Sequence, residues 1–192
     1  TQGVSSAASD VYKRQLVIKP DGKMYVHSGI GNLGTHSVFD TTRAACEVLD
    51  FPFEETTVAW GDTSRHLPWS ASQGGSQTTH AHTRANWAAG LDAKRKLQEI
   101  AARDLGGAPD DYDVGGGRVY HRSNRSRFLS FARAAERAIQ IGGKYDGHEL
   151  PEDINPFTTT SATNLAGEGL MGVARDNFGR DGDTYTFVIG FA

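Results

Sequence analysis

Hydrophobic and polar residues alternate along 16–28 and predict a β-hairpin, because two short alternating segments flank the turn-forming run Pro20-Asp21-Gly22. The same alternation predicts further strands in four stretches: 56–60, 112–120, 170–174 and 185–191. Glycines at 115–117 divide the second of these into another hairpin. A turn at 179–182 separates the last two strands.

Apolar residues recur every three or four positions in three other segments, 37–49, about 79–105 and 129–141, and predict α-helices. In the first segment Ser37 and Asp40 have capping-box spacing. Its apolar face consists of Val38, Thr42, Cys46 and Leu49. The second helix has a narrow stripe rich in small residues, which suits packing against another backbone: Ala85, Ala88, Leu97, Ile100, Ala101 and Leu105.

Residues 144–164 contain two prolines and no periodicity, so this segment is predicted to be a loop. Strands and helices are mixed along the chain, and tight turns join several strand pairs. These features predict an α+β fold: two layers, with a mixed, partly antiparallel sheet, hairpins and three main helices.

The composition fits one globular domain, with 192 residues, 38% hydrophobic residues and a net charge of −3. No apolar run approaches the roughly 20 residues of a membrane-spanning helix. The single cysteine, Cys46, excludes an internal disulfide and a cysteine-ligated cluster built from this chain alone. The negative net charge argues against nucleic-acid binding. A basic run is therefore interpreted as a solvated loop or subunit contact: Arg118, His121, Arg122, Arg125 and Arg127.

The two ends do not resemble natural termini. Residues 1–15 begin with Thr and end in DVYKRQ, which resembles a translated sequencing adapter, so they are interpreted as an assembly scar. The chain stops on an apolar strand pattern, and such an edge invites aggregation. We therefore expect 16–192 to be a partial domain truncated at both ends. The compartment is unsettled, with the cytoplasm favoured over the periplasm.

Two glycine-bearing loops, 29–36 and 72–79, each lie between a predicted strand and a predicted helix. The first contains a G-x-G-x-x-G motif, Gly29-Ile30-Gly31-Asn32-Leu33-Gly34. Glycines allow backbone N–H groups to approach a ligand closely, and a helix start offers unpaired donors. Each loop is thus a candidate anion site, although neither has the lysine of a P-loop. The alternative is a pair of ordinary strand-to-helix turns.

A dinucleotide-binding Rossmann domain is a weaker interpretation of the first loop. The strand before it, 23–28, alternates and pairs with its predecessor, whereas the first Rossmann strand is buried on both faces. The acidic residue that should follow by about 20 positions is also misplaced. The best candidate, Asp62, is 28 residues beyond Gly34.

Taken together, these motifs resemble the second molybdopterin-binding domain of the xanthine dehydrogenase and aldehyde oxidase family of molybdenum hydroxylases. The resemblance rests on DGKMYVHSGIGNLGTHS, VAWGDTSRHLPWSASQGGSQTTHAHTRA and KRKLQEIAARDLGG in that order. It covers residues 16–107 and extends more loosely to 192.

The resemblance implies that both loops hold the pterin phosphate and dithiolene through backbone amides. The implied contacts are Leu33, Gly34, Thr35, Gln73, Gly74, Gly75, Ser76, Gln77 and Thr78. The backbone of Gly75 is expected to pass nearest the molybdenum. Many members have a glutamine where this chain has Thr35. Either a water, His36 or Asn32 takes the place of its side chain, or this branch binds the metal end differently.

The resemblance further implies oxidation of an aldehyde or N-heterocycle at carbon with oxygen from water. The expected cofactor is molybdopterin with molybdenum, with or without a cytosine nucleotide. The expected partners are iron–sulfur and flavin (FAD) subunits or domains, the rest of the same large subunit, and a small organic substrate.

The glutamate base of the family is expected outside this chain, since Glu168, in Gly167-Glu168-Gly169, precedes the strand pair that the family motif follows. The chain alone is therefore expected to be inactive. A scaffold or assembly module with the same fold is the alternative.

Several other residues have simpler interpretations. Asp62-Thr63 is expected to form an Asx turn, and His80 and His82 point to different helix faces, which disfavours a metal pair. Three tryptophans are expected to be packing residues: Trp60, Trp69 and Trp87. Of these, Trp69 lies beside the second loop and is also a candidate active-site wall.

Overall fold

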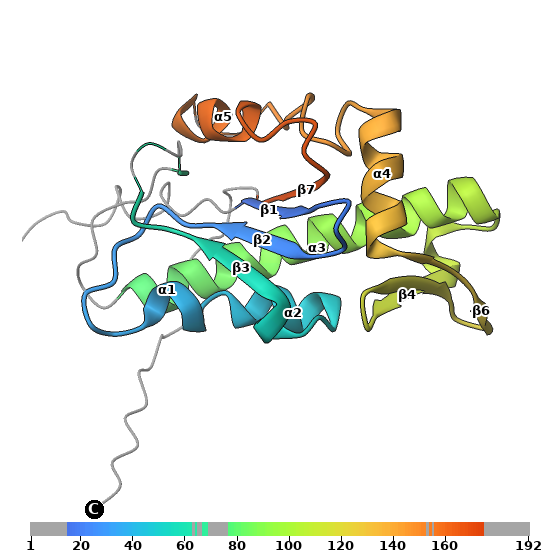
Figure 1. The fold of residues 1–192 in the computed structure, drawn as a ribbon, viewed down its shortest axis with the longest axis horizontal. Helices are drawn as coiled ribbons and strands as arrows, with labels where there is room; N and C mark the ends of the chain where they lie inside the picture. The colour runs from blue at the N-terminus through green and yellow to red at the C-terminus, as the bar shows by residue number, and fades with distance from the viewer. Residues whose placement is uncertain are drawn as a thin grey trace, which may run out of the picture.

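The computed structural model describes residues 15–62, 64, 67, 68, 77–152, 154 and 156–174. Within these ranges the chain forms two sheets that both contact a long helix, α3 (Gln77–Leu105) (Figure 1). The α+β prediction is confirmed, and the strands divide into two separate sheets.

The first sheet has four strands in the order β3-β2-β1-β7. They are β1 (Gln15–Ile18), β2 (Met24–His27), β3 (Thr56–Ala59) and β7 (Leu170–Val173). β1 is antiparallel to both β2 and β7, so the predicted hairpin is confirmed. β2 and β3 are parallel, and the chain between them carries two helices, α1 and α2. The first glycine loop is thus part of a β-α-β crossover, although β2 begins as a hairpin strand.

The second sheet is antiparallel, with the order β4-β5-β6. Its strands are β4 (Tyr112–Gly115), β5 (Arg118–His121) and β6 (Asn124–Ser130). The predicted turn is confirmed at Gly116 and Gly117, with φ of 56° and 70°. The solvated loop predicted for the basic run is wrong, because most of that run lies in β5 and β6. Arginine side chains pack on aromatic rings in this sheet, and the Arg118 guanidinium carbon lies 4.6 Å from the Phe128 ring centroid. Because arginines take part in the packing, the sequence shows a basic run here and not the apolar alternation typical of a strand.

The first predicted helix is two helices, α1 (Ser37–Asp40) and α2 (Arg43–Leu49), separated by a turn. The Thr41 and Thr42 hydroxyls donate to the carbonyls of Ser37 and Val38 at 2.7 and 3.1 Å. Such bonds within the helix favour a bend. The predicted capping box is also wrong, since the residue before α1 is His36, whose side chain makes no cap hydrogen bond. The predicted apolar face is nevertheless buried: Val38, Thr42, Cys46 and Leu49.

The later helices are α4 (Phe131–Ile141) and α5 (Pro156–Thr163). α4 starts two residues after the predicted boundary, where the Ser130 hydroxyl accepts from the Arg133 N–H at 3.2 Å. The loop predicted over 144–164 is wrong in its last part, which forms α5. Proline at the first helical position is compatible with a helix start, so the proline that suggested a loop begins the helix.

Two hydrophobic clusters lie on opposite faces of the first sheet. Alternate β1 residues divide between them: Leu16 and Ile18 pack toward α2, α3 and α4, while Val17 packs toward α5. α5 accordingly lies across the sheet from α2 in Figure 1. The predicted strand 185–191 and the turn at 179–182 lie outside the described residues. No helix in the described ranges is long and apolar enough to cross a membrane.

Candidate functional site

The first glycine loop leaves the C-terminal end of β2, an inner strand of the first sheet, and leads into α1 (Figure 1). Two short-range contacts give it a defined shape. The Asn32 Oδ1 accepts hydrogen bonds from the Gly34 and His36 N–H groups at 3.0 and 3.3 Å. The hydroxyls of Thr35 and Ser37 are hydrogen-bonded at 2.7 Å. The Asn32 and Thr35 side chains therefore serve the loop itself.

The loop contains two residues in the left-handed region, Gly34 at φ 84° and His36 at φ 54°. Glycine adopts this conformation without strain, but histidine does not. The residue before a helix is usually extended, so His36 is held in an uncommon conformation for its position. Such strain is most often kept where a loop serves a purpose beyond connecting two elements.

The predicted contact residues Leu33, Gly34 and Thr35 are all exposed, with the Leu33 side chain 68% exposed. A Cβ built on Gly34 would meet nothing within 4 Å among the described atoms. The Leu33 and Thr35 N–H groups make no hydrogen bond within the described part of the chain. Two main-chain donors thus flank an open glycine, an arrangement that can bind an anion.

The second loop is largely outside the described residues, which include neither Gln73, Gly74, Gly75 nor Ser76. Of its predicted contacts, Gln77 and Thr78 are the first residues of α3, two positions before the predicted start. Whether the two loops face one cleft therefore stays a prediction.

α2 lies against α3 (Figure 1). The Asn86 Nδ2 on α3 donates to the carbonyl of Thr41, between α1 and α2, at 2.8 Å. One turn later, a Cβ built on Gly90 would lie 3.1 Å from the Val48 Cβ and 3.3 Å from the Ala45 Cα. The backbones of α2 and α3 are therefore close together, as the small residues of α3 predict.

Other residues singled out in the sequence have structural roles. Asp62 forms the predicted Asx turn, since its Oδ1 accepts from the Ser64 N–H at 3.0 Å. Glu168 pairs with Lys19 at 2.7 Å beside the β1–β2 turn. Trp60 packs edge-to-face on Phe39 at a centroid distance of 5.6 Å, as predicted, whereas Trp87 is 46% exposed. Trp69 and Thr63 lie outside the described residues, as do the His80 side chain and residues 1–14.

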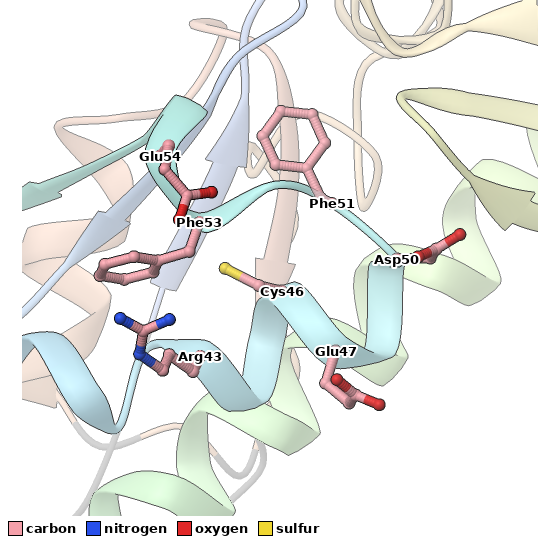
Figure 2. Close-up of a pocket in the computed structure, with 7 residues that line it drawn as sticks. All are labelled: Arg43, Cys46, Glu47, Asp50, Phe51, Phe53 and Glu54. Carbon is pink, nitrogen blue, oxygen red and sulfur yellow. The ribbon is translucent and has the colours of Figure 1, made fainter.

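A cavity of about 330 Å³ lies elsewhere, between α2 and the segment that follows it (Figure 2). Its lining residues are Arg43, Cys46, Glu47, Asp50, Phe51, Phe53 and Glu54. Figure 2 shows Arg43 beneath the Phe53 ring, with the guanidinium carbon 4.1 Å from the ring centroid. The Cys46 thiol points toward the same space.

This cavity lacks the chemistry of a reactive site. Burial raises the pKa of the Cys46 thiol, so the thiol stays protonated at neutral pH and is a poor nucleophile. Its sulfur lies 3.5 Å from the Thr56 hydroxyl and is buried, as the sequence predicts for a small apolar residue. Among the described residues no group of three or more His, Cys, Asp or Glu side chains could hold a metal ion.

The sequence did not single out Asn86 or Gly90 as residues of this region. Asn86 is a polar residue on the buried face of α3, next to Ala85 and Ala89, and only 1% exposed. A polar residue in an otherwise apolar stripe was the available signal. Its partner could not be predicted, because it is a main-chain carbonyl 45 residues earlier.

The sequence profile of the molybdopterin cofactor-binding domain family matches residues 2–180. The chain is 30% identical over 156 residues to the aldehyde oxidoreductase molybdenum-binding subunit PaoC of Escherichia coli O157:H7. The same subunit of strain K12 is 29% identical over 156 residues. Each match covers 79% of this chain and 20% of the relative, so the chain spans about a fifth of the curated relatives' length.

Solved structures share the fold at lower identity. CO dehydrogenase from Oligotropha carboxidovorans matches with a TM-score of 0.60 and 18% identity, over 86% of this chain and 18% of that chain. Quinoline 2-oxidoreductase from Pseudomonas putida 86 matches with a TM-score of 0.57 and 17% identity, over 87% and 19%.

Proposed function

The chain belongs to the molybdopterin cofactor-binding domain family, and we propose that its two glycine loops help to hold the cofactor in the catalytic subunit of a molybdenum hydroxylase. One structural observation carries this proposal. Within the segment that matches the family, the exposed Gly34 is flanked by the Leu33 and Thr35 N–H groups, which make no hydrogen bond among the described residues.

The residues of the first loop fit a phosphate-bearing cofactor. A phosphate group needs several N–H or O–H donors on a rigid support, and its negative charge strengthens each hydrogen bond. The Asn32 side chain provides rigidity, because it fixes the Gly34 and His36 amides. The Leu33 and Thr35 amides would then bind the pterin phosphate without a lysine or arginine.

We assign the remaining contacts to Gln73, Gly74, Gly75, Ser76, Gln77 and Thr78. Glycine at 75 would let the backbone approach the metal end of the cofactor closely, since it has no Cβ. Molybdopterin, when bound, supplies the molybdenum at which carbon is oxidised with oxygen from water. The role of this chain is to bind and orient that group.

We propose for the whole protein oxidation of an aldehyde or an N-heterocycle at carbon. The relatives carry names from both classes, an aldehyde oxidoreductase and a quinoline 2-oxidoreductase. The proposed partners are the rest of the large subunit together with iron–sulfur and FAD-containing subunits or domains. The pterin would carry either a phosphate alone or a cytosine nucleotide.

The test is molybdenum and pterin analysis of the natively purified full-length protein and its Gly75→Val variant. We expect about one molybdenum and one pterin per subunit in the natural protein. The variant should lose both, at least tenfold, because a branched side chain would occupy the space of the cofactor. Ala108→Val, at an exposed position just after the C-terminal end of α3, is the control and should load normally.

A full-length protein that lacks molybdenum and pterin would support the scaffold alternative. Normal occupancy in the Gly75→Val variant would contradict the placement of the cofactor at the second loop.

A further inference from the structure

Asn86 is a buried amide that joins two parts of the proposed cofactor site. Its side chain donates from α3 to the Thr41 carbonyl, 2.8 Å away, at the bend between α1 and α2. The first loop enters α1 five residues before this carbonyl. α3 starts at Gln77, nine residues before Asn86 or about 13 Å along a helix axis. One hydrogen bond therefore connects the helix after the first loop to the helix after the second.

The bend offers this carbonyl because the local sequence ends α1 early. The hydroxyls of Thr41 and Thr42 turn back to the α1 carbonyls, and both residues are buried, at 2% and 0% exposed. Within the turn, the Thr41 carbonyl accepts a long hydrogen bond from the Ala44 N–H at 3.4 Å, and its second lone pair is available to a partner from outside α1 and α2. Asn86 provides that partner.

A second contact lies on the same face of α3. Gly90 follows Asn86 by four residues, so both face α2, and Gly90 admits the Ala45 and Val48 atoms at 3.1 to 3.3 Å from where its Cβ would be. Asn86 and Gly90 together fix both the position and the separation of the two helices. A substitution at either residue would shift the first loop relative to the start of α3.

A buried asparagine is also energetically unfavourable at a position whose only role is packing. Its Oδ1 is buried and has no hydrogen-bond partner among the described residues. A leucine of similar size would pack in this apolar stripe without leaving an unpaired polar atom. The amide is therefore not explained by packing alone, whereas the directional bond to Thr41 gives it a positioning role.

We propose that Asn86 is a positioning residue for the cofactor site, which sets the first loop against the start of α3. This inference rests on the proposed function for its effect on cofactor binding. It assigns Asn86 no contact with the cofactor and acts only through the Thr41 carbonyl.

The test compares Asn86→Leu with Gln98→Leu in the full-length protein. Gln98 is a matched control: it lies on the same helix, is buried, and its Nε2 donates to the main-chain carbonyl of Tyr112 at 2.7 Å. That bond joins α3 to the second sheet, far from the glycine loops. The two variants remove equivalent hydrogen bonds in opposite halves of α3.

Two measurements distinguish a positioning role from a loss of stability. The first is molybdenum and pterin per folded subunit, which should fall at least threefold in Asn86→Leu and stay normal in Gln98→Leu. The second is amide hydrogen exchange of residues 29–40 in the cofactor-free protein, which should be at least threefold faster in Asn86→Leu only. If Asn86→Leu does not fold, Asn86→Ala is measured in the same way.

Natural cofactor content and natural exchange in the Asn86 variant would overturn the inference, as would equal losses in the Gln98 variant. Absence of molybdenum and pterin from the natural protein would instead contradict the proposed function. In that case the exchange of residues 29–40 still tests whether Asn86 holds the first loop.

Discussion

The two ends of α3 differ in how completely their apolar side chains are buried and their polar side chains are paired. At the C-terminal end Leu97 and Ile100 are fully buried, and the Gln98 amide donates to Tyr112. Charged residues there are also paired: the Arg137 guanidinium donates to both Asp104 oxygens at 2.5 and 2.8 Å, and Lys144 lies 2.6 Å from Glu99. This end joins the second sheet and α4 to the core.

The N-terminal half of α3 has large apolar side chains that are partly exposed and a buried polar atom that is unpaired within the described part of the chain. Trp87 and Leu91 are about half exposed, and the Asn86 Oδ1 is buried without a partner among the described residues. The neighbouring first loop holds His36 at positive φ. Natural proteins keep such costs mainly at functional sites. This comparison supports the proposal that one end of α3 provides stability and the other serves the cofactor site.

Leu97→Ala should give the largest effect on stability and none on loading. Removing a fully buried leucine side chain costs about 3 kcal/mol in free energy of unfolding. Thermal and urea unfolding of the full-length protein measure that loss, and molybdenum per folded subunit should be unchanged. Leu91→Ala, at a residue 47% exposed on the same helix, is the control and should cost under about 0.5 kcal/mol. Loss of cofactor from folded Leu97→Ala protein would break the division between the two ends.

Asp104→Asn should have a smaller, pH-dependent effect. The hydrogen bond from Arg137 holds the pKa of the Asp104 carboxyl below its ordinary value of 3.8. The ion pair therefore stabilises the fold above pH 3.8, and its contribution is lost as the pH falls through the lowered pKa. Because the pair is near the surface, the variant should lose about 1 kcal/mol or less at pH 7.

Chemical unfolding from pH 7 down to pH 2 measures this effect. The natural protein and Asp104→Asn should converge in stability at the acid end, and high salt at pH 7 should narrow their difference. A difference that stayed constant with pH would show that the pair does not stabilise this end of α3. Cofactor content at pH 7 should be equal in the two proteins.

Sequence patterns predicted the elements whose side chains pack in a regular period. The β1–β2 hairpin, the β4–β5 hairpin and α3 are confirmed because alternation or helical spacing there coincides with burial. β6 was missed because polar residues and arginines fill its first four positions, 124–127, so the sequence shows little apolar alternation there. α5 was missed because a proline that can start a helix was interpreted as a loop signal.

The position of the first loop was predictable from the sequence, but its geometry only in part. The G-x-G-x-x-G run located the exposed loop, and Leu33, Gly34 and Thr35 are exposed as a binding role requires. The bend at Thr41 and its bond to Asn86 could not be predicted, because they depend on two segments meeting in space. Conformational strain at His36 likewise leaves no trace in the sequence.

His36→Gly should give the smallest change in stability, and it is compared with Asp50→Gly. These are the two non-glycine residues at positive φ in the described ranges, at 54° and 44°. Asp50 has a structural reason for this conformation, since it ends α2 and its N–H caps the helix carbonyls. Glycine removes the backbone strain of the folded state but raises the conformational entropy of the unfolded state. The free energy of unfolding of each variant should therefore rise by only about 0.5 kcal/mol.

The two variants should differ in cofactor content. Two side chains are candidates to replace the glutamine of the family, Asn32 and His36. The Asn32 Oδ1 is engaged within the loop, whereas the exposed His36 side chain makes no hydrogen bond within the described residues. We therefore expect His36→Gly to retain about half of the molybdenum and pterin, whereas Asp50→Gly retains all of it. A gain in stability with full loading in both would show that the His36 side chain is dispensable. Because stability and loading move in opposite directions only for His36, this pair separates strain kept for binding from strain kept for capping.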